Sequence, residues 1–472
     1  MIQEMRKEFM NAEKNVLAAC EKAKEVQPKL NAVVTFIDPS EQLSHLEEHK
    51  DGLMAGVPIV LKDNVCTKGI RTTASSKILD NYIPIYDAFI VEKLRNAGAI
   101  TIAKASLDEL AMGGTNTTAY TGPVHNPWDI TRMSGGSSGG SAVLVASGVV
   151  PFAIGSDTGD SVRKPASYCG VIGVKPTYGR ISRYGIIPYS SSLDHVGYFT
   201  RNVEDACIGL EVLAGRDDRD MTTSTKEVPA FSKLLNSSLE GKKIGVIKNV
   251  IDSIKNQETV QIFNELIEKC KAQGAEIVDV TFDNNLMRAI LPTYYMIANC
   301  EATANHSNLD GIRFGVQEPG ESTEEVMIQS RTEGFGIQVR KRFITGSYGL
   351  FVENQEKLFR KAQRVRRLIV EEMKNALTSV DCLIAPASSS IAPKLEGEQM
   401  DELSEDYLIA ENHMVMGNFS GYPSMTLPMG FSKECPLGVN ITCRAFEEET
   451  MFNIAAGIEK CTGLKDIIAE VK

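Results

Sequence analysis

Short apolar runs alternate with amphipathic segments along most of the chain. Residues 88–96 have the spacing of a helix, and residues 99–103 form an apolar run typical of a buried strand. The same order returns in a strand, a helix and a strand at residues 242–248, 257–272 and 276–280. Because strands that alternate with helices usually lie parallel, this pattern predicts an α/β protein built on a mixed, largely parallel sheet.

The start of the chain and one long interruption suggest how it is organised. Residues 1–27 predict a charged helix and residues 31–37 an edge strand, so residues 1–50 are expected to form an N-terminal helical segment. Residues 51–472 are expected to form one large domain, with a charged, helical insertion at about residues 281–380. Further strands are expected at residues 381–386, 425–428 and 437–443, and a closing helix at residues 449–461.

Composition limits the class of protein. The 472 residues are 43% hydrophobic, which allows a large core, and they carry a formal net charge of −11. This charge disfavours a protein that binds nucleic acid over its whole surface. The ten cysteines show no CxxC pair and no Cys/His ligand spacing, so we expect neither a metal site nor a disulfide framework. The charged N-terminus and the lack of an apolar run of about 18 residues predict a cytoplasmic protein without a membrane segment.

Two glycine-serine loops carry the strongest chemical signal. They are GGSSGGS at residues 135–141 and GSDTGDS at residues 155–161. Such runs are often flexible linkers, but residues 142–154 between the loops are almost entirely apolar. The glycines therefore interrupt a buried helix and a buried strand, where small residues let backbone N–H groups and hydroxyls approach a ligand. This arrangement is typical of an acyl-transfer site.

A lysine at the end of a short apolar strand is the candidate base. Lys62 follows GVPIVL at residues 56–61, a position where a lysine ordinarily reaches solvent or pairs with a carboxylate. If Lys62 lies desolvated beside the serine loops instead, its pKa falls and the neutral amine can accept a proton. None of the six histidines lies in a nucleophile-elbow pattern, which disfavours a histidine triad.

These motifs resemble the amidase signature family. The resemblance covers nearly the whole chain and is most specific from Lys62 through GGSSGGS to GSDTGDSVRKPASYCGVIGVKPTYGR at residues 155–180. It implies a large mixed sheet covered by helices on both faces. It also implies a Ser-Ser-Lys triad, in which Lys62 is the base, Ser137 relays the proton after a cis peptide bond, and Ser161 is the nucleophile.

The resemblance implies further roles in the reaction. Ser161 would attack the side-chain carboxamide of glutamine, ammonia would leave, and water would hydrolyse the glutamyl-enzyme. Backbone donors typically contribute about 10²–10³ in rate each when they bind the oxyanion. Here the oxyanion hole would be formed by the backbone N–H groups of Thr158, Gly159, Asp160 and Ser161.

Three more residues are expected to bind the substrate. Arg342 stands where the family has an arginine for the α-carboxylate, and a guanidinium forms a two-pronged bond to such a group. The alternative is that residues 340–342 form a solvated helix face. Tyr294 or Tyr295 would line the same pocket, or else pack in the core. Glu411 would accept the substrate ammonium, at a position where the family usually has aspartate.

The nucleophile loop departs from the family at two positions. Asp160 stands where glycine is most frequent, and Lys164 where glutamine is usual. Because a carboxylate beside an oxyanion is unfavourable, we expect Asp160 to point outward or to pair with Lys164. Asp157 and Arg163 are expected to pair with each other or with the backbone in a structural role.

Four segments resemble the branch of the family that hydrolyses glutamine within tRNA-dependent amidotransferases. They are residues 179–197, 301–315, 331–347 and 417–431. The resemblance implies a heterotrimer of this chain with a kinase/transferase B subunit and a small C subunit. Misacylated Glu-tRNA(Gln) or Asp-tRNA(Asn) would bind through that complex. The chain has no GxxxxGK[ST] loop and needs no cofactor of its own, so ATP and magnesium would be used on the kinase/transferase partner. The alternatives are a stand-alone amidase for small amides and a non-catalytic scaffold.

Overall fold

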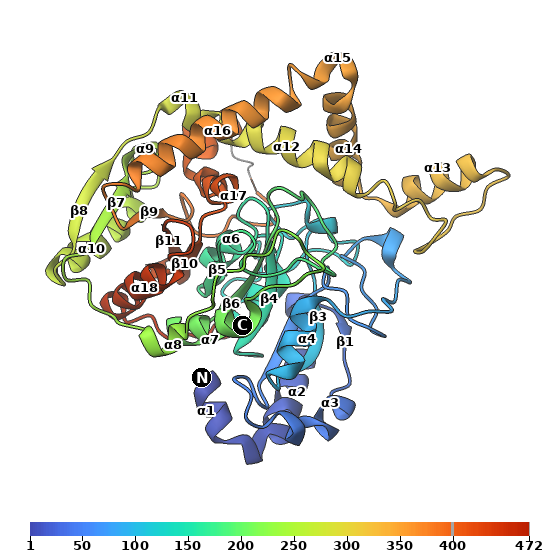
Figure 1. Ribbon diagram of the computed structural model, residues 1–472, viewed down its shortest axis with the longest axis horizontal. Coiled ribbons are helices and arrows are strands. Elements are labelled where there is room, and N and C mark those ends of the chain that lie inside the picture. Colours follow the sequence, from blue (N-terminus) through green and yellow to red (C-terminus); the bar gives the residue numbers. More distant parts are fainter. Residues whose placement is uncertain (398–400, 472) are drawn as a thin grey trace.

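One mixed sheet runs through the protein, which is described by a computed structural model at residues 1–397 and 401–471 (Figure 1). In these residues it has 11 strands in the order β1-β3-β2-β4-β6-β5-β10-β11-β9-β7-β8. The strands are β1 (Val33–Phe36), β2 (Pro58–Lys62), β3 (Ile100–Ala105), β4 (Phe152–Asp157), β5 (Ile172–Lys175), β6 (His195–Thr200), β7 (Lys243–Ile247), β8 (Glu276–Val280), β9 (Cys382–Pro386), β10 (Ser424–Ser432) and β11 (Cys435–Thr442).

Helices cover both faces of this sheet. The α-helices are α1 (Ile2–Lys7), α2 (Ala12–Leu30), α3 (Ser40–Ser44), α4 (Phe89–Asn96), α5 (Gly139–Ala146), α6 (Arg163–Cys169), α7 (Val203–Leu213), α8 (Phe231–Leu234), α9 (Lys248–Ser253), α10 (Gln257–Ala272), α11 (Asn284–Arg288), α12 (Ile290–Asn305), α13 (Thr323–Gly334), α14 (Ile337–Leu350), α15 (Val352–Gln355), α16 (Phe359–Ala376), α17 (Met416–Ser420) and α18 (Glu448–Thr462). Short 3₁₀ helices lie at Phe9–Asn11, Leu46–His49, Lys77–Leu79, Glu109–Ala111 and His413–Val415, and a π-helix at Asp406–Ala410.

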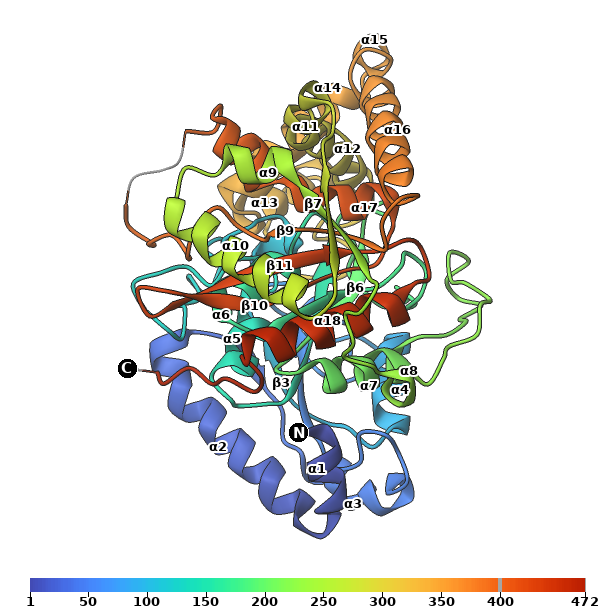
Figure 2. The same ribbon diagram turned by 90° about the vertical axis from the view of Figure 1, so that its left-hand side faces the viewer.

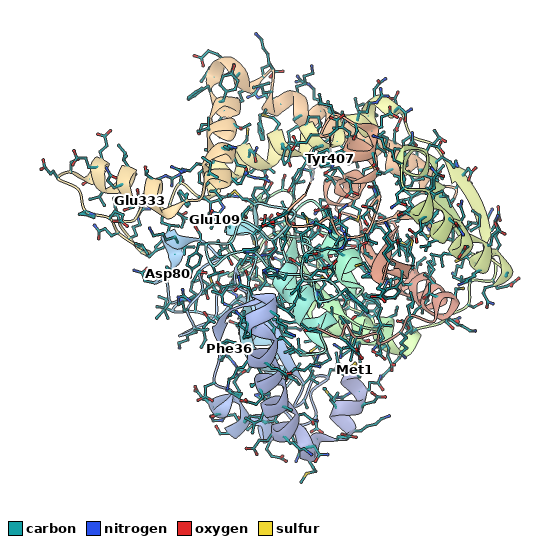
Figure 3. All side chains as sticks on the ribbon, turned by 180° about the vertical axis from the view of Figure 1, so that it is seen from behind. Met1, Phe36, Asp80, Glu109, Glu333 and Tyr407 are labelled. Carbon is teal, nitrogen blue, oxygen red and sulfur yellow. The ribbon has the colours of Figure 1, made fainter. Side chains whose placement is uncertain are left out.

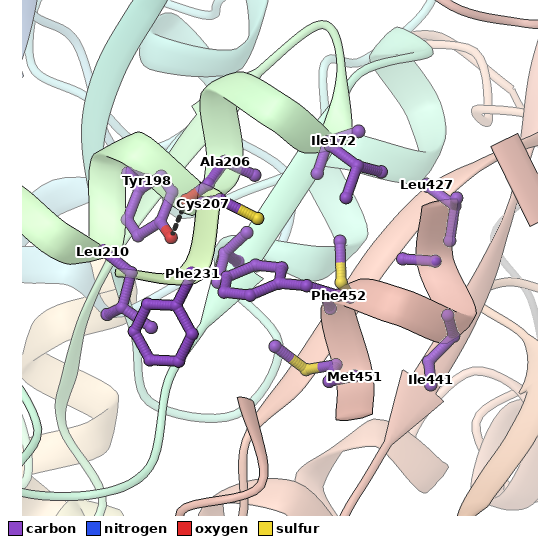
Figure 4. Packing of buried hydrophobic residues seen from close by; sticks show 14 of the residues in the cluster. Ile172, Tyr198, Ala206, Cys207, Leu210, Phe231, Leu427, Ile441, Met451 and Phe452 are labelled. Atoms are coloured by element: carbon purple, nitrogen blue, oxygen red, sulfur yellow. Dashed lines mark hydrogen bonds between the residues drawn. The ribbon is translucent and has the colours of Figure 1, made fainter. Parts of the chain in front are cut away.

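Alternate side chains of β2 belong to different hydrophobic clusters. Ile59 and Leu61 of β2 pack in the cluster that contains α4, α7, α10 and α18, whereas Val60 packs with α2 and α5. Figure 2 shows α10 and α18 over β10. Part of this cluster is drawn in Figure 4, where Phe231 and Phe452 meet edge to face with ring centroids 5.6 Å apart. Helices therefore cover both faces of the mixed sheet, as predicted.

The strand directions correct one prediction. The pairs that β2 forms with β3 and β4 are parallel, as are those of β7 with β8 and β9. Between β4 and β9, however, every neighbouring pair is antiparallel, so the sheet is not largely parallel. Parallel pairing is confined to β2 with its two neighbours and β7 with its two neighbours, toward the two ends of the sheet. In the centre, β10 and β11 form a hairpin through Lys433 and Glu434, whose φ angles of 49° and 62° make a tight two-residue turn.

The N-terminal helices differ slightly from the prediction, whereas α10 and β8 do not. Helix α2 continues through Pro28 to Leu30 and ends where Asn31 adopts a left-handed conformation, a cap that asparagine tolerates. It is separated from α1 by a 3₁₀ turn, so residues 1–27 are not one helix. The predicted bounds of α10 and β8 are confirmed. The assignment of residues 1–50 and 51–472 to separate units stays a prediction.

Helices α11 to α16 lie between β8 and β9 along the chain and extend away from the sheet (Figure 1), and that they form an insertion stays a prediction. A buried carboxylate ties these helices to the core. Glu109, labelled in Figure 3, accepts hydrogen bonds from the backbone N–H of Gly336 (2.9 Å) and from Ser76 Oγ (2.6 Å). Burial raises the pKa of Glu109 to about 7. Since Gly336 immediately precedes α14, this contact positions the helix that carries Arg342.

The first serine loop is held by close backbone contacts. A Cβ atom added to Gly140 would lie 2.6 Å from the carbonyl oxygen of Ser106 and 2.7 Å from that of Ala32. Backbone oxygens cannot rotate away as a flexible side chain can. Glycine is therefore required by packing at the start of α5, and the flexible-linker interpretation of GGSSGGS is excluded.

We expect Gly140→Ala to lower the free energy of unfolding by about 2 kcal/mol, because the new methyl group overpacks a rigid site. Urea unfolding of the purified chain measures the change. Gly114→Ala is the control, since nothing lies within 4 Å of an added Cβ there, and a change below about 0.5 kcal/mol is expected. Equal effects of the two substitutions would contradict the packing argument.

Candidate active site

Lys62 lies at the end of β2 and is completely buried among serine hydroxyls. Its Nζ donates to Ser138 Oγ (2.7 Å), Ser137 Oγ (2.8 Å) and Ser156 Oγ (2.9 Å), and it also contacts the Ser156 carbonyl oxygen (3.3 Å). Among the described residues, no carboxylate lies within ion-pair distance of this nitrogen. The predicted meeting of Lys62 with the serine loops is confirmed.

Burial lowers the pKa of Lys62 to about 7. The negative charges of Asp108, Asp157 and Asp194 raise the pKa of Lys62 from a distance, but burial has the larger effect. Because the resulting pKa lies close to neutrality, a large fraction of Lys62 is an uncharged amine at pH 7. Such an amine can accept a proton from a neighbouring hydroxyl.

The two serine loops meet through their backbones. The N–H of Ser138 donates to the carbonyl oxygen of Ser161 (3.1 Å), and the Gly136–Ser137 peptide bond is cis, as expected. Asp108 supports the first loop: its own N–H donates to the Ser137 carbonyl oxygen (3.1 Å), while its carboxylate accepts from the N–H of Asn116 (2.8 Å). Ser161 is almost completely buried beside these contacts.

A buried ion pair shapes the turn that carries Ser161. Asp157 and Arg163 are both fully buried, with Oδ1 and Nη2 2.9 Å apart. Arg163 also donates to the Gly159 carbonyl oxygen (2.7 Å) and to Asn418 Oδ1 (2.6 Å). Burial alone would raise the pKa of Asp157, but Arg163 holds it well below its usual range. The expected structural pairing of Asp157 with Arg163 is confirmed.

The backbone of the nucleophile turn has free donors. No acceptor within residues 1–397 and 401–471 takes a hydrogen bond from the N–H groups of residues 158–161. The Gly159 carbonyl is held by Arg163, and Thr158 Oγ1 donates to Asp194 (2.7 Å). The turn is therefore fixed in place while its N–H groups remain available to an oxygen atom of a ligand.

A cavity of about 260 Å³ lies beside the partners of Lys62. Its lining includes Asn64, Ser156, Thr158, Tyr189 and Asp194. Asn64 donates to Ser156 Oγ (3.1 Å), and Asp194 accepts from the N–H of Tyr189 (2.8 Å). Space for a small molecule therefore adjoins the base and the nucleophile turn.

Arg342 faces inward from α14. Its Nη1 donates to Tyr189 Oη (2.6 Å), and its guanidinium lies 5.1 Å from the ring centroid of Tyr295. Lys341 next to it is exposed, whereas Arg342 is half-buried, so the solvated-face alternative does not hold for Arg342. In the part of the chain that is described, Arg342 is a positive charge without a carboxylate partner.

Tyr294 forms a wall against the nucleophile turn. A Cβ atom added to Gly159 would lie 3.0 Å from Tyr294 Cζ and 3.1 Å from its Oη. The adjacent Tyr295 packs on Tyr294 with ring centroids 5.6 Å apart and lies under Arg342. Tyr294 therefore lies against the nucleophile turn and Tyr295 lies against Arg342, and that either of them lines the substrate pocket stays a prediction.

Glu411 is buried but already has partners. Lys164 Nζ lies 2.7 Å from Glu411 Oε2, and the Ser389 N–H donates to Oε1 (2.7 Å). Of the two alternatives expected for Asp160, the pairing with Lys164 is wrong, because Lys164 bonds the buried Glu411 instead. The alternative that Asp160 points outward stays a prediction. Asp160 is half-buried, and none of the described residues makes a hydrogen bond or an ion pair with its carboxylate. Burial raises the pKa of Asp160 to about 6.

Several residues of the site were not identified from the sequence. Ser138 and Ser156 stand next to recognised loop positions, and their hydroxyl groups were the available signal. Asp108 carries no local pattern, whereas Tyr189 and Asp194 lie in residues 179–197, a segment that was recognised without a role for either residue. Within the described residues, no group of three or more His, Cys, Asp or Glu side chains has the arrangement of a metal site. No helix there is long and apolar enough to span a membrane.

Comparison with known proteins agrees with this geometry. The sequence profile of the amidase family matches residues 14–452. The A subunit of glutamyl-tRNA(Gln) amidotransferase from Fusobacterium nucleatum is 39% identical over 472 residues, covering 98% of this chain and 96% of that protein.

Two solved structures extend the comparison. The crystal structure of the A subunit of glutamyl-tRNA(Gln) amidotransferase from Thermotoga maritima has a TM-score of 0.84 and 34% identity, and the match covers 100% of this chain and 98% of that one. Native peptide amidase from Stenotrophomonas maltophilia has a TM-score of 0.81 and 26% identity, over 96% and 94% of the two chains. The fold, the site and these similarities lead to one conclusion: the chain belongs to the amidase family.

Proposed function

We propose that this chain is the glutamine-hydrolysing A subunit of glutamyl-tRNA(Gln) amidotransferase. In this role it releases ammonia that converts Glu-tRNA(Gln) to Gln-tRNA(Gln). Similarity to proteins of that name over nearly the whole chain supports the assignment. The observation that carries the chemistry is the buried Lys62, whose amine lies 2.8 Å from Ser137 Oγ in the serine-lined site.

The reaction begins with proton transfer to neutral Lys62. The proton of Ser161 Oγ passes to Ser137 as Ser137 passes its own to Lys62 Nζ, and Ser161 Oγ bonds to the carboxamide carbon of glutamine. The tetrahedral oxyanion accepts hydrogen bonds from the N–H groups of residues 158–161. The C–N bond then breaks, and the amide nitrogen takes the proton back and leaves as ammonia. Water attacks the ester along the same proton route and releases glutamate.

The substrate carboxylate binds to the inward-facing arginine. Arg342 has no carboxylate partner among the described residues, and Tyr189 holds its guanidinium in place. Tyr294 forms the wall between this group and Gly159. Glu411 is held by Lys164 and by the Ser389 N–H, and its negative charge adds to burial in raising the pKa of Asp160.

The complete reaction needs partners in this proposal. The kinase/transferase B subunit uses ATP and magnesium to activate the tRNA-bound carboxylate. The small C subunit completes the cytoplasmic heterotrimer, and misacylated tRNA binds through the complex. The chain itself uses no cofactor. The second candidate is a stand-alone amidase, which is favoured by the structural likeness to peptide amidase.

Ammonia release from glutamine distinguishes these two functions. We expect the purified chain to be weakly active alone, and to become strongly active when it is co-purified with the B and C subunits and supplied with misacylated tRNA and ATP. Full turnover of small amides by the isolated chain would instead assign it as a stand-alone amidase.

In the assembled complex, Ser161→Ala is expected to lower kcat for glutamine by at least about 10⁴-fold, because it removes the nucleophile. Steady-state ammonia release measures the effect. Ser141→Ala is the matched control in the first serine loop, since Ser141 Oγ donates to the Ile154 carbonyl oxygen (2.7 Å) and does not touch Lys62. It should retain kcat within about threefold, and comparable losses in both variants would argue against Ser161 as the nucleophile.

The rate should also follow the protonation of Lys62. Only the neutral amine accepts a proton, so kcat/KM for glutamine is expected to fall about tenfold per pH unit below pH 7 and to level off above it. Lys62→Arg stays protonated and should be inactive across the range. A wild-type rate that is constant from pH 5.5 to pH 8 would exclude Lys62 as the base.

A further inference from the structure

The carboxylate expected to bind the substrate ammonium already has a cation of the protein beside it. Lys164 Nζ lies 2.7 Å from Glu411 Oε2 and also donates to the carbonyl oxygens of Glu411 (2.9 Å) and Ala387 (3.0 Å). These three contacts use the three protons of the ammonium group. Glu411 also accepts from the Ser389 N–H (2.7 Å) through Oε1. A substrate ammonium would have to compete with Lys164 for this carboxylate.

Asp160, in the nucleophile loop, is a carboxylate that has no such partner among the described residues. It stands between Gly159, which contacts Tyr294, and Ser161, the proposed nucleophile. It is half-buried, and no described residue forms a hydrogen bond or an ion pair with its side chain. A partly buried carboxylate without a partner is unfavourable in the free protein, and a bound cation would relieve this cost.

The charges of Asp160 and Arg342, which both act on Tyr294, complement those of a free amino acid. When ionised, Asp160, Lys164 and Glu411 sum to a charge of −1. Arg342 lies on the other side of Tyr294 from the turn. It carries a charge of +1, and no described carboxylate forms an ion pair with it.

We propose that Asp160 binds the α-ammonium group of glutamine, while the Lys164–Glu411 ion pair forms the wall behind it. This inference rests on the proposed function of the site. It also explains how a carboxylate is tolerated beside the oxyanion hole. A bound ammonium neutralises Asp160, whereas an amide without an α-amino group leaves the charge of Asp160 opposed to the developing oxyanion. Asp160 therefore makes the transition state more favourable for amides that carry an α-amino group than for amides that lack one.

Two substrates and one charge-removing substitution test this selection. The probes are glutamine and glutaramate, which is glutamine without its α-amino group, and kcat/KM is measured for both in the assembled complex. We expect Asp160→Asn to lower the ratio of kcat/KM for glutamine over glutaramate by at least about tenfold. The rate with glutaramate should stay unchanged or rise, because the repulsion of the oxyanion is lost. An unchanged ratio would overturn the proposal.

Further variants separate this role from a structural one. Asp160→Gly removes the charge without adding bulk and should lower the ratio as Asp160→Asn does, while Asp160→Glu should recover part of it. Asp406→Asn is the matched control: this buried carboxylate interacts with Glu411 but lies outside the nucleophile loop, and the ratio should not change. Equal losses for both substrates in the Asp160 variants would show a structural role and overturn the proposal.

The measurements distinguish a failure of the proposed function from a failure of the inference about Asp160. If the wild-type complex releases no ammonia from glutamine, the proposed function is wrong and the inference falls with it. If the wild-type complex hydrolyses glutamine and the Asp160 variants keep the wild-type ratio of the two substrates, only the inference about Asp160 is wrong.

Discussion

The loss of water around the Lys62 ammonium is the constraint on which the site depends. A lysine in water holds its proton at neutral pH, and only burial without a touching carboxylate brings its pKa to about 7. The parallel strands β2 and β4 bring Lys62 next to Ser156, and the two serine loops supply the hydroxyl groups that surround its Nζ. Hydroxyls satisfy the hydrogen bonds of both the charged and the neutral amine, which a carboxylate would not do.

This arrangement needs nearby carboxylates to be occupied elsewhere. Asp157 is neutralised by Arg163, Asp108 accepts from backbone N–H groups, and Asp194 accepts from Thr158 and from the N–H of Tyr189. Each of these bonds also holds part of the backbone around the nucleophile. The same contacts thus keep these carboxylates from touching Lys62, although their charge still acts on it from a distance, and they fix the turn that offers its N–H groups to an oxyanion. The helical insertion adds Arg342 and Tyr294 from outside the sheet.

Local patterns in the sequence were sufficient to predict several helices and strands and the main chemical groups of the site. Strand–helix alternation at the ends of the sheet, the bounds of α10 and β8, and the charged insertion follow from periodicity over a few turns or strands. The serine loops and Lys62 were recognisable because dense glycine and serine beside apolar runs, and a lysine ending a buried strand, are uncommon local combinations. The pairing of Asp157 with Arg163 spans only six residues and was also predictable.

Tertiary structure decided what depends on contacts between distant segments. Lys164 has Asp160 four residues away, yet it bonds Glu411, 247 residues away, because the fold buries that carboxylate against it. Arg342 meets Tyr189 across 153 residues, and neither position carries a local signal for the other. The antiparallel centre of the sheet likewise depends on which strands become neighbours in space. The sequence by itself determined which groups could do the chemistry, and the fold determined which charges remain free for a substrate, since burial and long-range neighbours choose among competing partners.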